Sequence, residues 1–249
     1  MPAVEDRRQM LLVSNSTVHG SGYLDHVENE IRNLLGHAHS VLFIPFALQD
    51  RAAYTAKARD RFRAMGIPLT SVHDVSNVAR AVHEAEAFFI GGGNTFRLLK
   101  GLYDHALLDP IRNRVNAGIP FIGSSAGSIV ACPSLKTTKD MPVVEPPAFE
   151  ALGLVKFQIS PHYLDPDPSS THMGETQEER IWQFLEENEF PVVGLREGSS
   201  LRIQGPIVTL LGPNTARIFR RNQEPIEVPA NSDLRPLLED IPVLTNEAA

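Results

Sequence analysis

The chain has 249 residues, of which 42% are hydrophobic and 21% are charged, and its formal net charge is -7. This composition is typical of a globular protein with a substantial core and excludes an intrinsically disordered chain. The negative charge, together with the lack of any run of Lys or Arg, argues against nucleic acid or an anionic membrane surface as a partner.

Short apolar segments alternate with longer amphipathic ones in the first half of the chain, which predicts strands alternating with helices. The predicted strand and helix pairs are 10–13 with 23–35, 41–46 with 51–64, 67–72 with 77–86, 87–90 with 95–107, and 120–123 with a short helix over 128–131. This order predicts an α/β fold of three layers, in which helices cover both faces of a mostly parallel sheet.

The second half of the chain has fewer helices between its strands. A strand is predicted over 154–159, a helix over 175–187 and a strand over 191–195, followed by short strands near 199–203, 207–211 and 216–219. Because no helix separates the last three, we expect antiparallel pairing at one edge of the sheet. A single domain is predicted over 1–249, with 222–249 as a peripheral tail.

The segment Gly123-Ser124-Ser125-Ala126-Gly127 directly follows a predicted strand. A strand that runs into G-x-S-x-G and then a helix is the pattern of a nucleophile elbow, in which the glycines allow a sharp turn that exposes the serine hydroxyl. Ser125 is therefore the candidate nucleophile, and the N–H of Ala126 is a candidate oxyanion donor. The alternative interpretation is a small-residue turn that tightens a junction between strand and helix.

Three other unusual clusters also follow predicted strands. They are Gly91-Gly92-Gly93-Asn94, Pro161-His162 and Arg196-Glu197-Gly198. The carboxyl ends of parallel strands share one edge of a sheet, so these clusters are expected to meet Ser125 there. A serine nucleophile needs a base and a carboxylate that orients the base, which makes His162 and Glu197 the candidates.

The glycine cluster supplies candidates for the binding side of the site. Gly92 or Gly93 is the candidate second oxyanion donor, because no side chain hinders its backbone N–H, and Asn94 is included as a binding residue. The cluster lacks the G-x-x-x-x-G-K-[ST] and G-x-G-x-x-G patterns of nucleotide sites. His83-Glu84 lacks the second histidine of H-E-x-x-H, so we predict neither a cofactor nor a metal.

A second carboxylate, Asp140, competes for the role of orienting His162. With Asp140, the chain order Ser, Asp, His would match an α/β-hydrolase. The interval from Ser125 to His162 is too short for that fold, in which further βα units intervene, so position favours Glu197. Asp140 is then expected in a loop near the site.

At these residues the chain closely resembles the peptidase E family of α-aspartyl dipeptidases, within the class-I-glutamine-amidotransferase-like superfamily. The resemblance rests on the segments 11–17, 43–46, 91–96, 123–127, 137–142, 161–162, 174–176, 197–198 and 212–214. It implies a flavodoxin-like fold and a cytosolic serine peptidase that removes an N-terminal aspartate from dipeptides without a cofactor. By motif, Ser125 carries over as nucleophile, His162 as base, and Glu197 or Asp140 as the acidic member.

The chain departs from the family pattern at Gln177, where the pattern usually has arginine. A substrate β-carboxylate requires a fixed cation, and glutamine cannot supply one. The cations weighed as substitutes are Arg97, Lys100, Arg180 and Arg196. Three alternatives stay open: a cyanophycinase-like hydrolase of aspartyl bonds, a broader aminopeptidase, and a non-catalytic ligand-binding protein.

Compartment and partners follow from the remaining features. The single cysteine, Cys132, cannot form a disulfide within the chain, and the charged N-terminal segment lacks the apolar core of a signal peptide. No stretch approaches the roughly 20 apolar residues of a membrane span. We therefore expect a cytoplasmic protein whose partner is a small peptide substrate, with apolar edge segments that are compatible with a homodimer.

Overall fold

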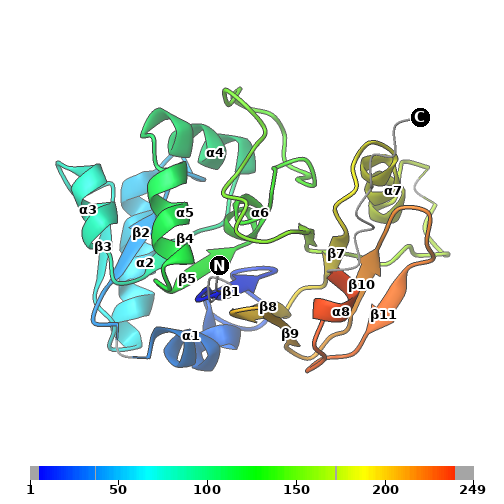
Figure 1. The fold of residues 1–249 in the computed structure, drawn as a ribbon, viewed down its shortest axis with the longest axis horizontal. Coiled ribbons are helices and arrows are strands. Elements are labelled where there is room, and N and C mark those ends of the chain that lie inside the picture. The colour runs from blue at the N-terminus through cyan, green and yellow to red at the C-terminus, as the bar shows by residue number, and fades with distance from the viewer. Residues whose placement is uncertain (1–5, 37, 172, 239–249) are drawn as a thin grey trace, which may run out of the picture.

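The computed structural model describes residues 6–36, 38–171 and 173–238, which form a large sheet, a small sheet and the helices that surround them (Figure 1). The large sheet has seven strands in the order β3-β2-β4-β5-β1-β8-β9. Their bounds are β1 (Gln9–Val13), β2 (Val41–Ile44), β3 (Leu69–Ser71), β4 (Phe88–Ile90), β5 (Phe121–Ser124), β8 (Ser200–Gln204) and β9 (Ile207–Leu211). The first five strands pair in parallel, whereas β8 and β9 pair antiparallel at one edge. The predicted mostly parallel sheet is confirmed.

A second, four-stranded sheet has the order β11-β10-β7-β6. Its strands are β6 (Gln158–Pro161), β7 (Val192–Leu195), β10 (Ala216–Phe219) and β11 (Ile226–Val228). β6 and β7 are parallel, while β10 and β11 add antiparallel strands. Figure 1 shows this sheet at one end of the molecule, next to α7 (Gln177–Glu187).

Helices cover both faces of the large sheet. Their bounds are α1 (Glu28–Leu35), preceded by the 3-10 turn Asp25–Val27, α2 (Arg51–Ala64), α3 (Val78–Glu84), α4 (Thr95–Asp104), α5 (Leu108–Asn116), α6 (Ala126–Val130), α7 (Gln177–Glu187) and α8 (Arg235–Leu238). Apolar residues of α1 and α2 pack in one core cluster, and those of α3 to α6 pack in another.

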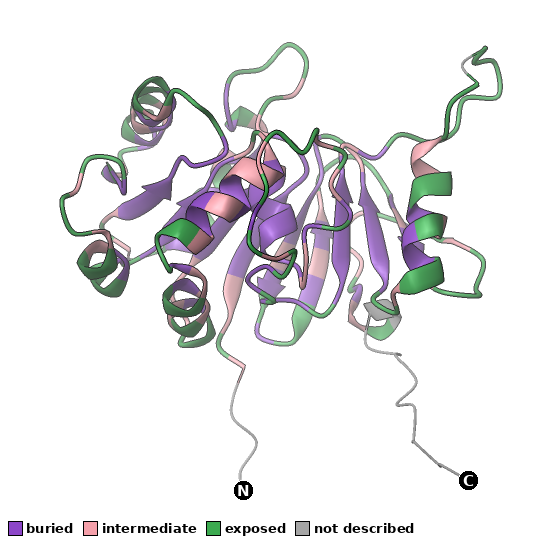
Figure 2. Cartoon of the chain, turned by 90° about the horizontal axis from the view of Figure 1, so that it is seen from above, coloured by how far each residue is buried: buried purple, intermediate pink, exposed green. Residues whose placement is uncertain are grey.

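Strand β1 shows why both faces are covered. Successive side chains of a strand point to opposite faces, and all four residues from Met10 to Val13 are fully buried. Met10 and Leu12 belong to the cluster under α3 to α6, whereas Leu11 and Val13 belong to the cluster under α1 and α2. Figure 2 shows the result, buried strands between helices whose outward faces are exposed. The predicted three-layer arrangement is confirmed.

The boundaries of several elements differ from those predicted. The helix expected over 95–107 ends at Asp104, because Ala106 adopts a left-handed conformation with a φ of 51° and turns the chain, and the helix α5 that follows was not predicted. The strand expected over 154–159 begins only at Gln158, since the N–H of Leu154 instead bonds to the carbonyl of Ala131 beside α6.

Part of the predicted peripheral tail has regular structure. β11 pairs with β10, and α8 follows, with Leu234 fully buried just before it. The polar composition of this segment concealed those contacts, because among residues 222–236 only Val228 and Leu234 are both apolar and buried. Residues 239–249 of the predicted tail lie outside the described residues. No helix in the described part of the chain has the length and apolarity needed to cross a membrane.

Candidate active site

Ser125 occupies a strained turn between β5 and α6. Its φ of 51° and ψ of -111° lie in a region that residues other than glycine rarely adopt, and its N–H donates to the carbonyl of Val13 at 2.9 Å. The flanking glycines have no room for side chains. A Cβ on Gly127 would lie 2.0 Å from the carbonyl oxygen of Ile90, and one on Gly123 would lie 2.6 Å from the carbonyl oxygen of Gly127. The segment therefore has the geometry of a nucleophile elbow.

The side chains of Ser125, His162 and Glu197 form a continuous chain of polar contacts. Ser125 Oγ lies 2.9 Å from His162 Nε2, and His162 Nδ1 lies 2.7 Å from Glu197 Oε1. The three residues follow the carboxyl ends of β5, β6 and β7. With the proton on Nδ1, the imidazole donates to Glu197 and leaves Nε2 able to accept the serine proton.

Asp140 has different partners. Its Oδ2 accepts hydrogen bonds from the Thr95 N–H at 2.7 Å, from Thr95 Oγ1 at 2.6 Å and from Thr138 Oγ1 at 3.0 Å. Thr95 is the first residue of α4, where a helix presents free N–H groups and the positive end of its dipole. Asp140 therefore ties its loop to the start of α4, while Glu197 is the carboxylate that contacts His162.

The glycine turn after β4 lies against the nucleophile. A Cβ on Gly92 would be 3.1 Å from Ser125 Cβ, so the Gly92 backbone packs directly beside the serine. Gly93 has a φ of 132°, which L-residues rarely adopt. Ala126 is the first residue of α6, and a helix supplies no acceptor for the N–H at that position. Gly92 thus contacts the serine directly, and Ala126 follows the serine in the chain.

The side chain of Asn94 is occupied within the protein. Its Oδ1 accepts from the Arg97 N–H at 3.0 Å, which caps α4, and its Nδ2 donates to the carbonyl of Met141 at 2.8 Å. Asn94 thus fixes the end of the glycine turn and the loop that contains Asp140. This geometry gives it a structural function next to the site.

Two residues that the sequence reasoning did not single out hold His162 in place. Ser14 Oγ accepts from the His162 N–H at 2.9 Å and donates to the carbonyl of Leu195 at 2.8 Å. Lys139 Nζ donates to the carbonyls of Pro161 at 2.6 Å and His162 at 3.3 Å. Both belong to segments that carry the family resemblance, 11–17 and 137–142, and this was the only signal in the sequence that pointed to them.

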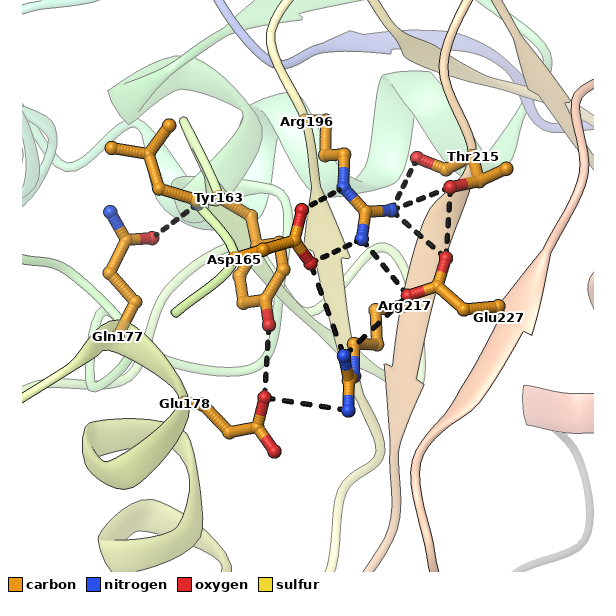
Figure 3. Close-up of polar contacts among 9 residues, drawn as sticks. Tyr163, Asp165, Gln177, Glu178, Arg196, Thr215, Arg217 and Glu227 are labelled. Atoms are coloured by element: carbon orange, nitrogen blue, oxygen red, sulfur yellow. Dashed lines mark hydrogen bonds and ion pairs between the residues drawn. The ribbon is translucent and has the colours of Figure 1, made fainter. Parts of the chain in front are cut away.

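An ionic network borders the site on the side of the small sheet (Figure 3). The Arg196 guanidinium bonds to both carboxylate oxygens of Asp165, at 2.9 and 2.5 Å, and to Glu227 at 2.9 and 3.1 Å. These bonds raise the pKa of Arg196 and lower that of Asp165. Arg196 precedes Glu197 directly and Asp165 follows His162 by three residues, so the network fixes both segments that carry these side chains.

Most cations weighed from the sequence already have carboxylate partners. Arg196 belongs to the network just described, Lys100 pairs with Asp104 at 2.7 Å, and Arg180 lies 3.5 Å from Glu175. Arg97 lies in the first turn of α4, after the glycine turn. Across the described residues, no group of three or more His, Cys, Asp or Glu side chains is arranged to hold a metal ion.

Known proteins resemble this chain over most of its length. Residues 10–211 match peptidase family S51. The chain is 51% identical over 230 residues to "Peptidase E" of Streptomyces coelicolor, a match that covers 92% of this chain and 95% of that protein. It is 47% identical over 235 residues to "Probable alpha-aspartyl dipeptidase" of Drosophila melanogaster, with coverage of 93% and 98%.

Two solved structures have a similar fold. One is a putative peptidase E from Listeria monocytogenes EGD-e, with a TM-score of 0.64, 20% identity, and coverage of 83% of this chain and 99% of that one. The other is a peptidase from an acI-B1 Actinobacterium, with a TM-score of 0.68, 15% identity, and coverage of 92% and 98%. The likeness to these structures shows the fold.

Proposed function

Because the chain belongs to peptidase family S51, we propose that it is a serine dipeptidase that hydrolyses dipeptides with an N-terminal aspartate through Ser125, His162 and Glu197. The observation that carries the proposal is the pair of contacts at 2.9 and 2.7 Å that link Ser125 Oγ through His162 to Glu197 Oε1. A relative that is 47% identical is named a probable alpha-aspartyl dipeptidase, which supports aspartate as the N-terminal residue.

The reaction begins with acyl transfer to the serine. His162 Nε2 takes the proton of the Ser125 hydroxyl as Oγ attacks the peptide carbonyl, and Glu197 stabilises the imidazolium that forms. The oxyanion of the tetrahedral intermediate receives hydrogen bonds from the N–H of Ala126 and from the N–H of Gly92 or Gly93. When the intermediate collapses, His162 gives its proton to the leaving amine.

Hydrolysis of the acyl-enzyme then restores the serine. His162 accepts a proton from water, the hydroxide attacks the ester carbonyl, and the second tetrahedral intermediate expels Ser125 Oγ, which takes the proton back from His162. Neither step needs a redox change or a transferred group other than the acyl chain. Asp140 keeps a supporting function in this scheme, because it holds the loop next to the glycine turn.

A cytoplasmic location forms part of the proposal. Cys132 is the only cysteine in the chain and is buried, so the fold depends on no disulfide that would require an oxidising compartment. Burial raises the pKa of the Cys132 thiol, which keeps it protonated and unreactive.

The test is hydrolysis of Asp-Leu, Glu-Leu, Asn-Leu and Ala-Leu by the wild type and by Ser125→Ala. Ser124→Ala is the matched control, because the neighbouring Ser124 hydroxyl is buried and no described residue bonds to it. We expect cleavage of Asp-Leu that Ser125→Ala abolishes and Ser124→Ala retains. Cleavage of the neutral dipeptides at equal rates would replace aspartate selectivity with a broader aminopeptidase, and no cleavage of any dipeptide would contradict the proposal.

A further inference from the structure

An aspartyl dipeptidase must bind the side-chain carboxylate of its substrate near the nucleophile, and this requirement rests on the function proposed above. The carboxylate carbon of an aspartate side chain is two bonds from the Cα atom. The cation that binds this carboxylate must therefore lie beside the triad. Lys139 meets this condition, because its ammonium bonds to the backbone carbonyl of His162. It also lies near enough to Glu197 for the two charges to interact.

The ammonium of Lys139 has neutral partners only. It donates to the carbonyls of Pro161 and His162 and to the side-chain oxygen of Gln177 at 3.0 Å. Among the ion pairs of the described residues, none includes Lys139, whose ammonium is partly desolvated although the residue as a whole is exposed. A partly desolvated ammonium that bonds only to neutral oxygens gains a stronger, charge-assisted hydrogen bond when a carboxylate replaces one of them.

The surroundings of Lys139 have room for a small anionic group. A cavity of about 70 Å³ is lined by Thr138, Lys139, Ser160, Gln177 and Arg180. A water molecule takes up about 30 Å³ in the liquid, so a carboxylate fits where about two waters would. Arg180 adds positive potential to the same cavity, since its charge acts on Lys139.

We propose that Lys139 is the residue that selects aspartate, its ammonium binding the side-chain carboxylate of the substrate while Ser125 attacks the adjacent peptide carbonyl. When the substrate carboxylate binds, it replaces Gln177 as an acceptor of the Lys139 ammonium. Gln177 is the one acceptor of the three that belongs to a side chain, and its Oε1 keeps the N–H of Leu164 at 3.1 Å as another donor. The carboxylate then accepts the third hydrogen bond of the ammonium. This bond is stronger than the one to Gln177, because both of its partners are charged.

The test compares kcat/KM for Asp-Leu and Asn-Leu, which differ in charge but hardly in shape. Lys139→Met is expected to lower the preference for Asp-Leu over Asn-Leu at least tenfold, beyond any loss that its bonds to the Pro161 and His162 carbonyls cause for both substrates alike. The control is Lys156→Met at an exposed lysine two residues before β6, which should leave the preference unchanged.

A purely structural function of Lys139 gives a different result. If its bonds to the carbonyls of Pro161 and His162 only hold the histidine, Lys139→Met will lower the rates for both substrates equally, and that outcome overturns the proposal. An unchanged preference overturns it too, as does a loss of preference in Arg97→Met but not in Lys139→Met. Thermal unfolding of each variant reports whether the fold is retained.

Two further variants, which keep a cation at or next to position 139, test the proposal if Lys139→Met folds poorly. Lys139→Arg should keep the preference for Asp-Leu. The double variant Lys139→Met/Gln177→Arg moves the cation to the side chain that contacts Lys139 at 3.0 Å, and it should regain at least half of the lost preference on a logarithmic scale. Failure of both variants to show any preference overturns the proposal. Absence of Asp-Leu hydrolysis in the wild type instead contradicts the proposed function itself.

Discussion

His162 Nδ1 lies 2.7 Å from Glu197 Oε1, although 35 positions in the chain separate the two residues. We expect Glu197→Gln to lower kcat about a hundredfold or more, because the amide neither stabilises the imidazolium nor enforces the tautomer that lets Nε2 accept a proton. Steady-state kinetics with Asp-Leu measures the loss, and KM should change much less than kcat.

Asp140→Asn is the control for that prediction. The amide keeps an oxygen for the hydrogen bonds of Thr95 but loses the negative charge at the start of α4, which should cost about 0.3–1 kcal/mol in the free energy of unfolding. Activity should stay within about tenfold of wild type. If Asp140→Asn lowered kcat as far as Glu197→Gln at unchanged stability, Asp140 would be the acidic member of the triad.

Gly92 leaves no space between its backbone and the nucleophile. In Gly92→Ala the new Cβ would meet Ser125 Cβ at 3.1 Å and the carbonyl oxygen of Ser124 at 3.2 Å. A shift of the serine away from His162 follows, and displacements of about 1 Å at a reacting group cost on the order of a hundredfold in rate. Activity and the thermal midpoint of unfolding should be measured together. Wild-type kcat in a folded Gly92→Ala protein would disprove the close contact.

Ser14 joins the large sheet to the segment that carries His162. Ser14→Ala removes the partner of the His162 N–H and of the Leu195 carbonyl, which should cost about 1–3 kcal/mol in stability and lower kcat roughly tenfold or more. Ser71→Ala is a matched control, because Ser71 is also buried and its Oγ accepts from the His73 N–H and from Thr55 Oγ1 on another part of the sheet. Urea unfolding and kcat separate the two effects, and equal kcat in both variants would contradict the function assigned to Ser14.

Asp165 should make the stability of the protein depend on pH. Its hydrogen bonds with Arg196 lower the pKa of its carboxyl in the folded state below the value of about 3.9 that it has when unfolded. The folded state then binds fewer protons, so this contribution is present above about pH 4 and is lost as the pH falls further. Wild type should exceed Asp165→Asn in stability at pH 7, and the difference should shrink by pH 3.

Urea unfolding at the two pH values measures that difference. The control is Asp60→Asn, because the side chains of Asp60 and its partner Arg63 are each 71% exposed and solvent screens such a pair. A gap between wild type and Asp165→Asn that stays constant from pH 7 to pH 3 would contradict the linkage.

The sequence predicted the parts of the site that depend on local patterns. Ser125 was recognisable because a strand, a glycine-flanked serine and a helix follow one another, and His162 and Glu197 because each follows an apolar strand. The predicted proximity of these residues required one sheet, whereas β5 belongs to the large sheet and β6 and β7 belong to the small one. The three side chains nevertheless lie in contact, and Ser14 joins the ends of β1 and β7 through a contact between residues 181 positions apart.

Contacts of that kind leave no periodic signal in a sequence. Ser14 and Lys139 act through backbone carbonyls and N–H groups of distant segments, and the identity of the residue that supplies a carbonyl does not matter. The predicted start of β6 was wrong for a related reason. Apolar side chains at 154, 155 and 157 are buried under other elements, and burial alone does not distinguish a sheet strand from an extended segment.

The preference for aspartate should itself depend on pH. Burial lowers the pKa of the Lys139 ammonium to about 8, against the opposing effect of the Asp140 and Glu197 charges and with the help of Arg180. A lysine is charged below its pKa, so the ratio of kcat/KM for Asp-Leu over Asn-Leu should be constant near pH 6.5 and fall above about pH 8. Taking the ratio cancels the titration of the substrate amines, whose pKa values also lie near 8. Lys139→Arg should keep the ratio constant up to pH 10, because guanidinium stays protonated there. A wild-type ratio that does not change between pH 6.5 and pH 10 would show that Lys139 does not bind the substrate carboxylate as a titrating ammonium.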